Sequence, residues 1–86
     1  MLVDGRVQGV FFRDTCRKEA ATRGVAGWVR NRSDGRVEAV FEGLPEAVEG
    51  MVAWCRRGPD LATIDALEVH VEPPTGRLGF RIEASI

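Results

Sequence analysis

The stretch GRVQGVFFR, residues 5–13, constrains what this chain can fold into more than any other part of it. Two glycines four residues apart, Gly5 and Gly9, bracket a short loop, and the composition from Asp14 to Ala21 favours a helix. A loop whose backbone N–H groups converge, followed by a helix N-terminus, is suited to binding an anion. The chain is therefore predicted to begin as strand, loop and helix.

Arg13 is expected in or near the first turn of that helix. A cation there opposes the helix macrodipole, which favours negative charge at the N-terminal end. Two interpretations follow. Either Arg13 faces an anion held by the loop, or it is a solvated arginine whose charge the adjacent Asp14 offsets.

Length and charge limit the classes of protein that remain. The chain has 86 residues and a net charge of −1, which predicts one domain over residues 1–86 and no bulk attraction to nucleic acid or to an anionic membrane. No apolar run approaches the ~20 residues that span a membrane. The segment 1–5 is too short and too polar for a signal peptide. We expect a cytoplasmic monomer without nucleic-acid or membrane partners.

The residues that commonly bind metals give no pattern here. Cys16 and Cys55 lack CxxC spacing and fall on predicted helices, which indicates buried reduced thiols, with a disulfide between the helices as the alternative. The single histidine, His70, is expected on the surface of a strand. The sequence therefore predicts no metal and no cofactor.

Hydrophobic periodicity predicts the remaining elements. They are a strand stump at 2–3, a helix from 12 to Gly24, strands at 25–31 and 37–42, a helix from Pro45 to 57, and strands at 67–72 and 80–85. This order is the α+β, ferredoxin-like split βαβ sandwich (βαββαβ), an antiparallel sheet with two helices on one face. Trp28, Phe41 and Phe80 are expected in its core.

Two polar side chains are placed to work with the loop. The guanidinium of Arg13 suits a phosphate bidentately. Asn31 ends the strand at 25–31, and its amide both donates and accepts, so it can hold a water in one orientation. The loop lacks the Gly-Lys-Ser/Thr ending of a P-loop, and the chain has no Ser-His-Asp set.

Phosphate chemistry without a nucleophile or a metal needs a leaving group that departs unprotonated. A carboxylate, whose conjugate acid has a pKa of roughly 4–5, meets this condition, whereas an alkoxide does not. The transition state spreads negative charge over oxygens that N–H donors and an arginine can stabilise. If the chain is an enzyme, these residues narrow its substrates to acyl phosphates.

The stretch 5–13 resembles the signature of the acylphosphatase family, and GWVRN at residues 27–31 resembles that family's second motif. The pairs Asp34-Gly35, Trp54-Cys55, Gly58-Pro59 and Gly79-Phe80 also follow the family pattern, so the resemblance covers nearly the whole chain. It implies hydrolysis of acyl phosphates to carboxylate and inorganic phosphate, without metal or cofactor.

The resemblance also implies roles for particular residues. Arg13 would bind the phosphoryl group, Asn31 would position the attacking water, and the substrate's own phosphate would accept the proton. The implied phosphate-binding loop consists of Gly5, Arg6, Val7, Gln8, Gly9 and Val10. For the side chain of Gln8, pinning the loop is the alternative role.

One departure concerns the first strand. Members of the family usually have several more residues before the glycine loop, whereas only residues 1–4 precede Gly5 here. Either the first strand is a short stump, or the recorded start lies downstream of the true one. A shortened central strand would leave backbone groups of its neighbours unpaired, at about 1–3 kcal/mol each where they are buried. We therefore expect reduced stability, or pairing with a partner at the gap.

Two other functions share the predicted fold. A non-catalytic module could hold a phosphate, a carboxylate or a protein partner, but it would not need the water-orienting amide of Asn31. An RNA-binding domain would need exposed aromatic residues on the sheet and a basic face, which this sequence does not indicate.

Overall fold

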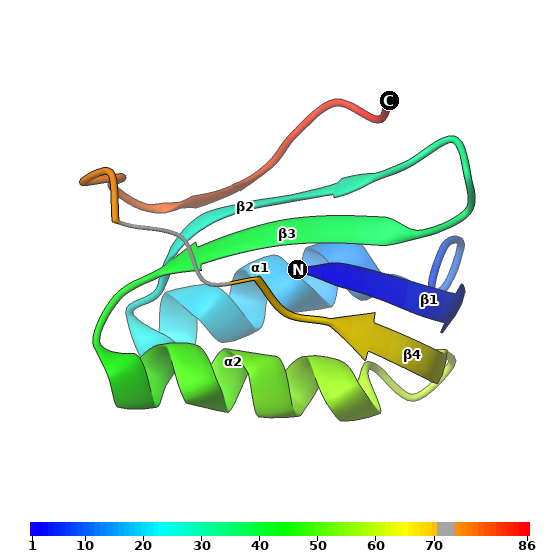
Figure 1. Cartoon of the computed structure of the whole chain (residues 1–86), viewed down its shortest axis with the longest axis horizontal. Coiled ribbons are helices and arrows are strands. Elements are labelled where there is room, and N and C mark those ends of the chain that lie inside the picture. The colour runs from blue at the N-terminus through cyan, green and yellow to red at the C-terminus, as the bar shows by residue number, and fades with distance from the viewer. Residues whose placement is uncertain (71–73) are drawn as a thin grey trace.

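The computed structural model describes residues 1–70 and 74–86 (Figure 1). The elements are β1 (Leu2–Arg6), α1 (Phe12–Arg23), β2 (Ala26–Asn31), β3 (Val37–Glu42), α2 (Pro45–Arg57), β4 (Thr63–Glu68) and β5 (Phe80–Ile82). Helix α1 ends at Gly24, whose left-handed backbone (φ 68°) directs its N–H to the carbonyls of Ala20 and Ala21. Proline at the first position of α2 sets that helix's start.

The five strands form one sheet in the order β4-β1-β3-β2-β5. The expectation of an antiparallel sheet is wrong at one pair, because β2 and β5 are parallel. The reason is topological. Strand β4 ends at the end of the sheet where β2 begins, so the chain crosses there to the opposite edge and runs alongside β2 in the same direction (Figure 1). The sheet is therefore mixed, and the ferredoxin-like α+β architecture is confirmed.

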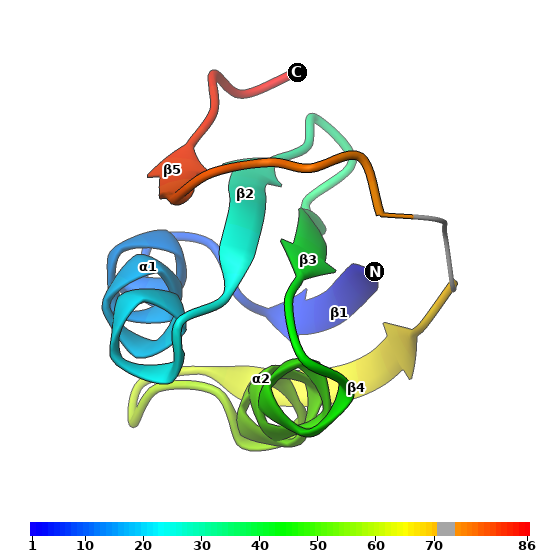
Figure 2. The same ribbon diagram turned by 90° about the vertical axis from the view of Figure 1, so that its left-hand side faces the viewer.

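Both helices pack on one face of this sheet (Figure 2). Side chains from the two helices and from three strands form a single buried cluster, with Phe12 and Trp54 in contact at a ring-centroid distance of 5.4 Å. The cluster includes Cys16 and Cys55, which are buried free thiols, as the apolar surroundings in the sequence indicate. The hydrogen-bond interaction with the Cys55 thiol, followed by burial, raises the pKa of the Cys16 thiol.

Of the three aromatic residues expected in the core, two pack against it and Trp28 does not. Phe41 and Phe80 pack against the core and stack at 5.7 Å, which supports the prediction for these two. Trp28 is not in the core, because it alternates with the fully buried Val29 and so faces away from the helices. The guanidinium carbon of Arg30 lies 4.7 Å from the Trp28 ring, a cation–π contact that covers it.

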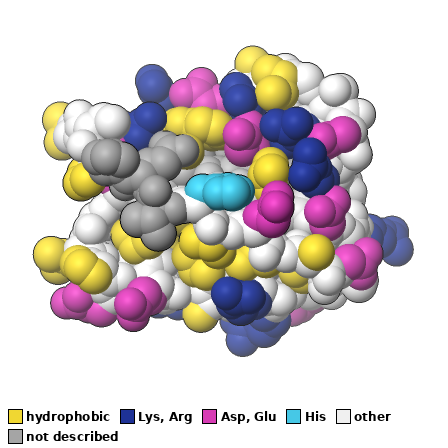
Figure 3. Space-filling model, viewed as in Figure 1, with side chains coloured by type: hydrophobic (Ala, Val, Ile, Leu, Met, Phe, Trp, Pro, Cys, Tyr) yellow, Lys and Arg dark blue, Asp and Glu magenta, His cyan; other side chains and the backbone are white. Residues whose placement is uncertain are grey.

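The strand expected at 67–72 begins and ends earlier, because β4 spans Thr63–Glu68. Its partner sets these limits: β1 pairs from Arg6, opposite Thr63, to Leu2, opposite Glu68. The expected residues 71 and 72 lie outside the described residues. His70 follows the end of β4 and is exposed (Figure 3), so it is a surface residue but not one of a strand.

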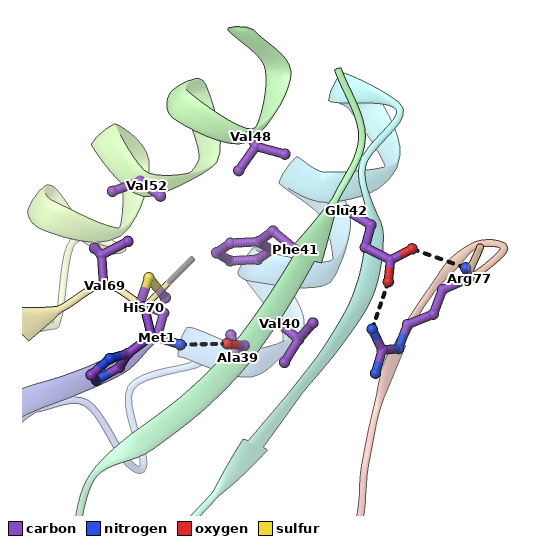
Figure 4. A pocket seen from close by; sticks show the side chains of 10 residues that line it. All are labelled: Met1, Ala39, Val40, Phe41, Glu42, Val48, Val52, Val69, His70 and Arg77. Atoms are coloured by element: carbon purple, nitrogen blue, oxygen red, sulfur yellow. Dashed lines mark hydrogen bonds and ion pairs between the residues drawn. The ribbon is translucent and has the colours of Figure 1, made fainter. Parts of the chain in front are cut away.

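Strand β1 meets β3 over a short length only. Two residue pairs form that ladder, Leu2 with Glu38 and Val3 with Val37. Met1 and Ala39 then exchange two backbone hydrogen bonds of 2.9 and 3.0 Å. Beyond Met1 lies a hollow of about 70 Å³ between β3, α2 and the chain after β4 (Figure 4). Its apolar lining is Met1, Ala39, Val40, Phe41, Val48, Val52 and Val69.

An apolar N-terminal extension should fill this hollow and stabilise the fold. We expect four residues of alternating valine and threonine, added before Met1, to raise Tm by about 5 °C or more, because they extend the ladder along β3. A Gly-Ser extension of the same length is the control. Equal melting temperatures for the two extended proteins, measured by circular dichroism, would contradict the prediction.

Glu42, at the end of β3, fixes the segment that leads into β5. Its carboxylate accepts hydrogen bonds from the backbone N–H and hydroxyl of Thr75 at 2.8 and 2.7 Å, and from the N–H and guanidinium of Arg77 at 2.9 and 2.6 Å. These donors, those of Thr75 foremost, lower the pKa of Glu42 to about 2. The contact between Glu42 and this segment is therefore stronger when the carboxylate is charged.

This contact should make stability depend on pH. A folded-state pKa below the ordinary value of 4.5 means that the contribution is complete above about 4.5 and is lost as pH falls toward about 2. Glu42→Gln should therefore lower Tm at pH 7 and differ little from wild type near pH 2. Glu49→Gln, a change of an exposed helix carboxylate, is the control and should leave Tm unchanged at both pH values. A Glu42→Gln deficit independent of pH would count against the account.

Candidate active site

The predicted loop is divided between β1 and the turn after it. Gly5 and Arg6 lie in β1, opposite Ile64 and Thr63 of β4. Gly5 sits at a bulge with φ 130°, and a Cβ there would collide with the carbonyl oxygen of Thr63, so glycine is required. The strand's bulge thus sets the direction in which the chain enters the loop.

The loop itself runs from Val7 to the start of α1. Val7 and Val10 are buried and anchor it to the core, while Gly9 is exposed with φ 73°. Phe11 precedes α1 in the left-handed conformation (φ 61°), and no side chain caps the helix. The N–H groups of the first turn, which lack partners inside a helix, are therefore left for a ligand.

Arg13 is the second residue of α1 and is half-buried. Among the described residues it has no ion-pair partner, and the adjacent Asp14 does not form an ion pair with it. Asp14 instead pairs with Lys18 and Arg17, each at 3.1 Å, and these contacts lower its pKa. The guanidinium of Arg13 is thus without an ion-pair partner in the part of the chain that the structure describes, and its binding of an anion stays a prediction.

Asn31 ends β2 and points to the same face as the buried Val29, two residues before it. Its Oδ1 is buried and has no hydrogen-bond partner among the described residues. A buried acceptor left unpaired costs about 1–3 kcal/mol, so folds keep one only where something else, such as a water or a ligand, satisfies it.

Gln8 connects the loop to the β2–β3 hairpin. Its amide nitrogen donates hydrogen bonds to the carbonyls of Arg32 and Arg36, at 2.8 and 3.0 Å. Because Asn31 lies immediately before that hairpin, these bonds fix the loop relative to Asn31. The side chain is therefore engaged in pinning the loop, the alternative stated for it above.

A pocket of about 340 Å³ brings the loop, α1, β2 and β5 together. It is lined by Val7, Gly9, Phe11, Phe12, Arg13, Asp14, Asn31 and Ile82. Of the predicted site residues, Val7, Gly9, Arg13 and Asn31 line it, whereas Gly5, Arg6, Gln8 and Val10 do not. The smaller hollow beyond Met1 has a separate lining that contains none of the predicted site residues (Figure 4).

The sequence reasoning missed Phe11 and Ile82. The helical periodicity assigns the neighbouring Phe12 to the core, and it leaves Phe11 in the motif without a role of its own. Ile82 reaches the pocket only because β5 runs parallel to β2, with Ile82 opposite Val29. No signal in the sequence assigns that pairing.

Known proteins match this chain over nearly its whole length. The family profile described as Acylphosphatase matches residues 1–82. The chain belongs to the acylphosphatase family. The acylphosphatase of Rubrobacter xylanophilus is 58% identical over 93% of this chain and 74% of its own. That of Gloeobacter violaceus is 54% identical over 93% of this chain and 86% of its own.

A solved structure agrees with the sequence comparisons. The crystal structure of acylphosphatase from Bacillus subtilis superimposes with a TM-score of 0.91 at 40% identity, covering 95% of this chain and 92% of that one. The family assignment made from residues 5–13 and 27–31 is confirmed, and the chain is an enzyme of the acylphosphatase family. Neither α1 nor α2, the helices of the described residues, is long and apolar enough to cross a membrane.

Proposed function

We propose that this acylphosphatase hydrolyses small-molecule acyl phosphates at the pocket between the loop, α1 and β2. The observation that carries the proposal is that two groups lining this pocket have no partner within residues 1–70 and 74–86: the guanidinium of Arg13 and the buried Oδ1 of Asn31. The guanidinium of Arg13 can bind the dianionic phosphoryl group, and Oδ1 of Asn31 can bind a water. Hydrolysis needs the phosphoryl group and the water in one pocket.

The phosphoryl group binds to the cradle formed by Arg13 and the loop. Backbone N–H groups of the loop and of the first turn of α1 surround its oxygens, and the helix dipole favours negative charge at that end. The cradle consists of residues 5–10 with Arg13, in which Gly9 leaves room for an oxygen and Gln8 holds the shape. It stabilises the charge that the equatorial oxygens carry in the transition state.

Asn31 orients the attacking water. Its Oδ1 accepts a hydrogen bond from that water, which fixes an oxygen lone pair toward the phosphorus. The water's proton passes to a phosphoryl oxygen of the substrate, which takes the place of a protein base, and the carboxylate leaves without protonation by a general acid. The P–O bond to the acyl oxygen breaks, and carboxylate and inorganic phosphate leave.

Turnover with a chelator present tests this function. Benzoyl phosphate should be hydrolysed by the wild-type enzyme at the same rate with and without EDTA, because charge on the leaving carboxylate needs no Lewis acid. Inorganic phosphate should inhibit competitively. A folded protein that binds phosphate but does not hydrolyse benzoyl phosphate would indicate a non-catalytic binding module instead. Loss of turnover in EDTA would contradict the metal-independent mechanism.

We also propose that the enzyme acts as a monomer in the cytoplasm. All the groups of the site come from one chain, and the two buried free thiols suit a reducing compartment. Light scattering during size-exclusion chromatography tests the oligomeric state, and a dimer at assay concentration would contradict it.

A further inference from the structure

Phe11 adopts a strained backbone conformation. It is a bulky residue in the left-handed region, at φ 61°, the one non-glycine residue of the described chain with positive φ. Its side chain is 72% exposed, so folding gains little from burying the ring. Strain of this kind persists where surrounding structure imposes it and is concentrated at functional sites.

Ile82 lines the same pocket from β5, an edge strand of the sheet. Its partner in the parallel ladder is Val29, so Ile82 and Asn31 point to the same face. Its side chain is 40% exposed, although other inward residues of the sheet, such as Val29, are fully buried. An apolar side chain next to the water-positioning group is thus left open to solvent.

Phe11 and Ile82 are the exposed large apolar residues that line this pocket, and they come from elements far apart in the sequence. The polar groups of the pocket, Arg13 and Asn31, are engaged by the phosphoryl group and the water. The apolar surface has no part in that chemistry, and the acyl group is the portion of the substrate that remains to be bound.

We propose that Phe11 and Ile82 form an acyl-binding wall that selects acyl phosphates with an aromatic or bulky aliphatic acyl group over small ones. This inference rests on the function proposed above. The phenyl ring of Phe11 offers a face or edge to an aromatic acyl group, and Ile82 offers an aliphatic contact across the pocket. Transfer of the acyl group from water to these surfaces favours large apolar groups.

The test compares two substrates that share the phosphoryl group and differ in the acyl group. Values of kcat/KM for benzoyl phosphate and acetyl phosphate are measured for wild type, Phe11→Ala, Ile82→Ala and the control Leu78→Ala. Leu78 is 97% exposed and does not line the pocket, so it controls for loss of an exposed apolar side chain. Competitive inhibition by inorganic phosphate reports on the cradle separately.

We expect Phe11→Ala to lose about 5–10-fold for benzoyl phosphate, the effect of one aromatic contact, and Ile82→Ala to lose somewhat less. Acetyl phosphate hydrolysis, phosphate inhibition and the Leu78→Ala control should stay within about twofold of wild type. Equal losses on both substrates would mean that Phe11 shapes the cradle, and would overturn the inference while leaving the proposed function intact. Unchanged benzoyl phosphate kinetics in both variants would overturn it too. A wild type inactive on both substrates would overturn the proposed function itself.

Discussion

Asn31→Ala should reduce kcat for benzoyl phosphate by about 10²–10³-fold, the typical effect of removing one preorganised polar group from a reacting centre. The alanine leaves the water without the acceptor that fixes its direction of attack. Because Asn31 Oδ1 accepts no hydrogen bond from the protein groups that the structure describes, its removal should not destabilise the fold. Steady-state kinetics and a thermal melt on the same preparation measure both effects.

The inhibition constant for inorganic phosphate separates this role from substrate binding. It should stay within about threefold of wild type in Asn31→Ala, because the cradle is intact. A large rise in that constant together with the loss of kcat would mean that Asn31 binds the phosphoryl group. A kcat near the wild-type value would remove Asn31 from the mechanism.

Arg13→Ala should lose both turnover and phosphate affinity. The guanidinium contacts the phosphoryl group in the ground state and in the transition state, so kcat/KM should fall by at least about 10³-fold and inhibition by phosphate should weaken strongly. Arg13→Lys should recover only part of the activity, since an ammonium cannot bind two oxygens in the planar geometry of a guanidinium.

Arg17→Ala is the matched control for this substitution. Arg17 lies one turn further along α1 and pairs with the exposed Asp14, so its removal should change activity by about twofold or less. A comparable loss in Arg13→Ala and Arg17→Ala would mean that the two arginines act through the general charge of the helix. Phosphate inhibition that is unchanged in Arg13→Ala would contradict the cradle.

Local patterns predicted much of the fold because they depend on neighbouring residues. The stripe of Phe12, Cys16 and Ala20, ended by Gly24, defined α1, and the alternation in β3 assigned its inward face. Trp28 was misplaced because alternation alone does not say which face is inward when both carry large residues. The guanidinium of Arg30 covers the Trp28 ring, which was expected to be buried in the core.

What the sequence could not supply depends on contacts between distant segments. The parallel direction of β5 follows from the crossing after β4, and the end of β4 follows from the length of its partner β1. The same limit applies to the site. Arg13 and Asn31 were identified from motifs, whereas Ile82 enters the pocket through the pairing of β5 with β2, and the exposure of Phe11 follows from the loop's path.

The central claim is that the site holds the phosphoryl group and directs water to phosphorus, and the fate of isotopic oxygen tests it most directly. Benzoyl phosphate is hydrolysed by the wild-type enzyme in water labelled with ¹⁸O, and both products are analysed by mass spectrometry. The account predicts that the label enters inorganic phosphate and that benzoate stays unlabelled. Label in benzoate would show attack at the carbonyl carbon, and would contradict the roles assigned to Arg13 and Asn31.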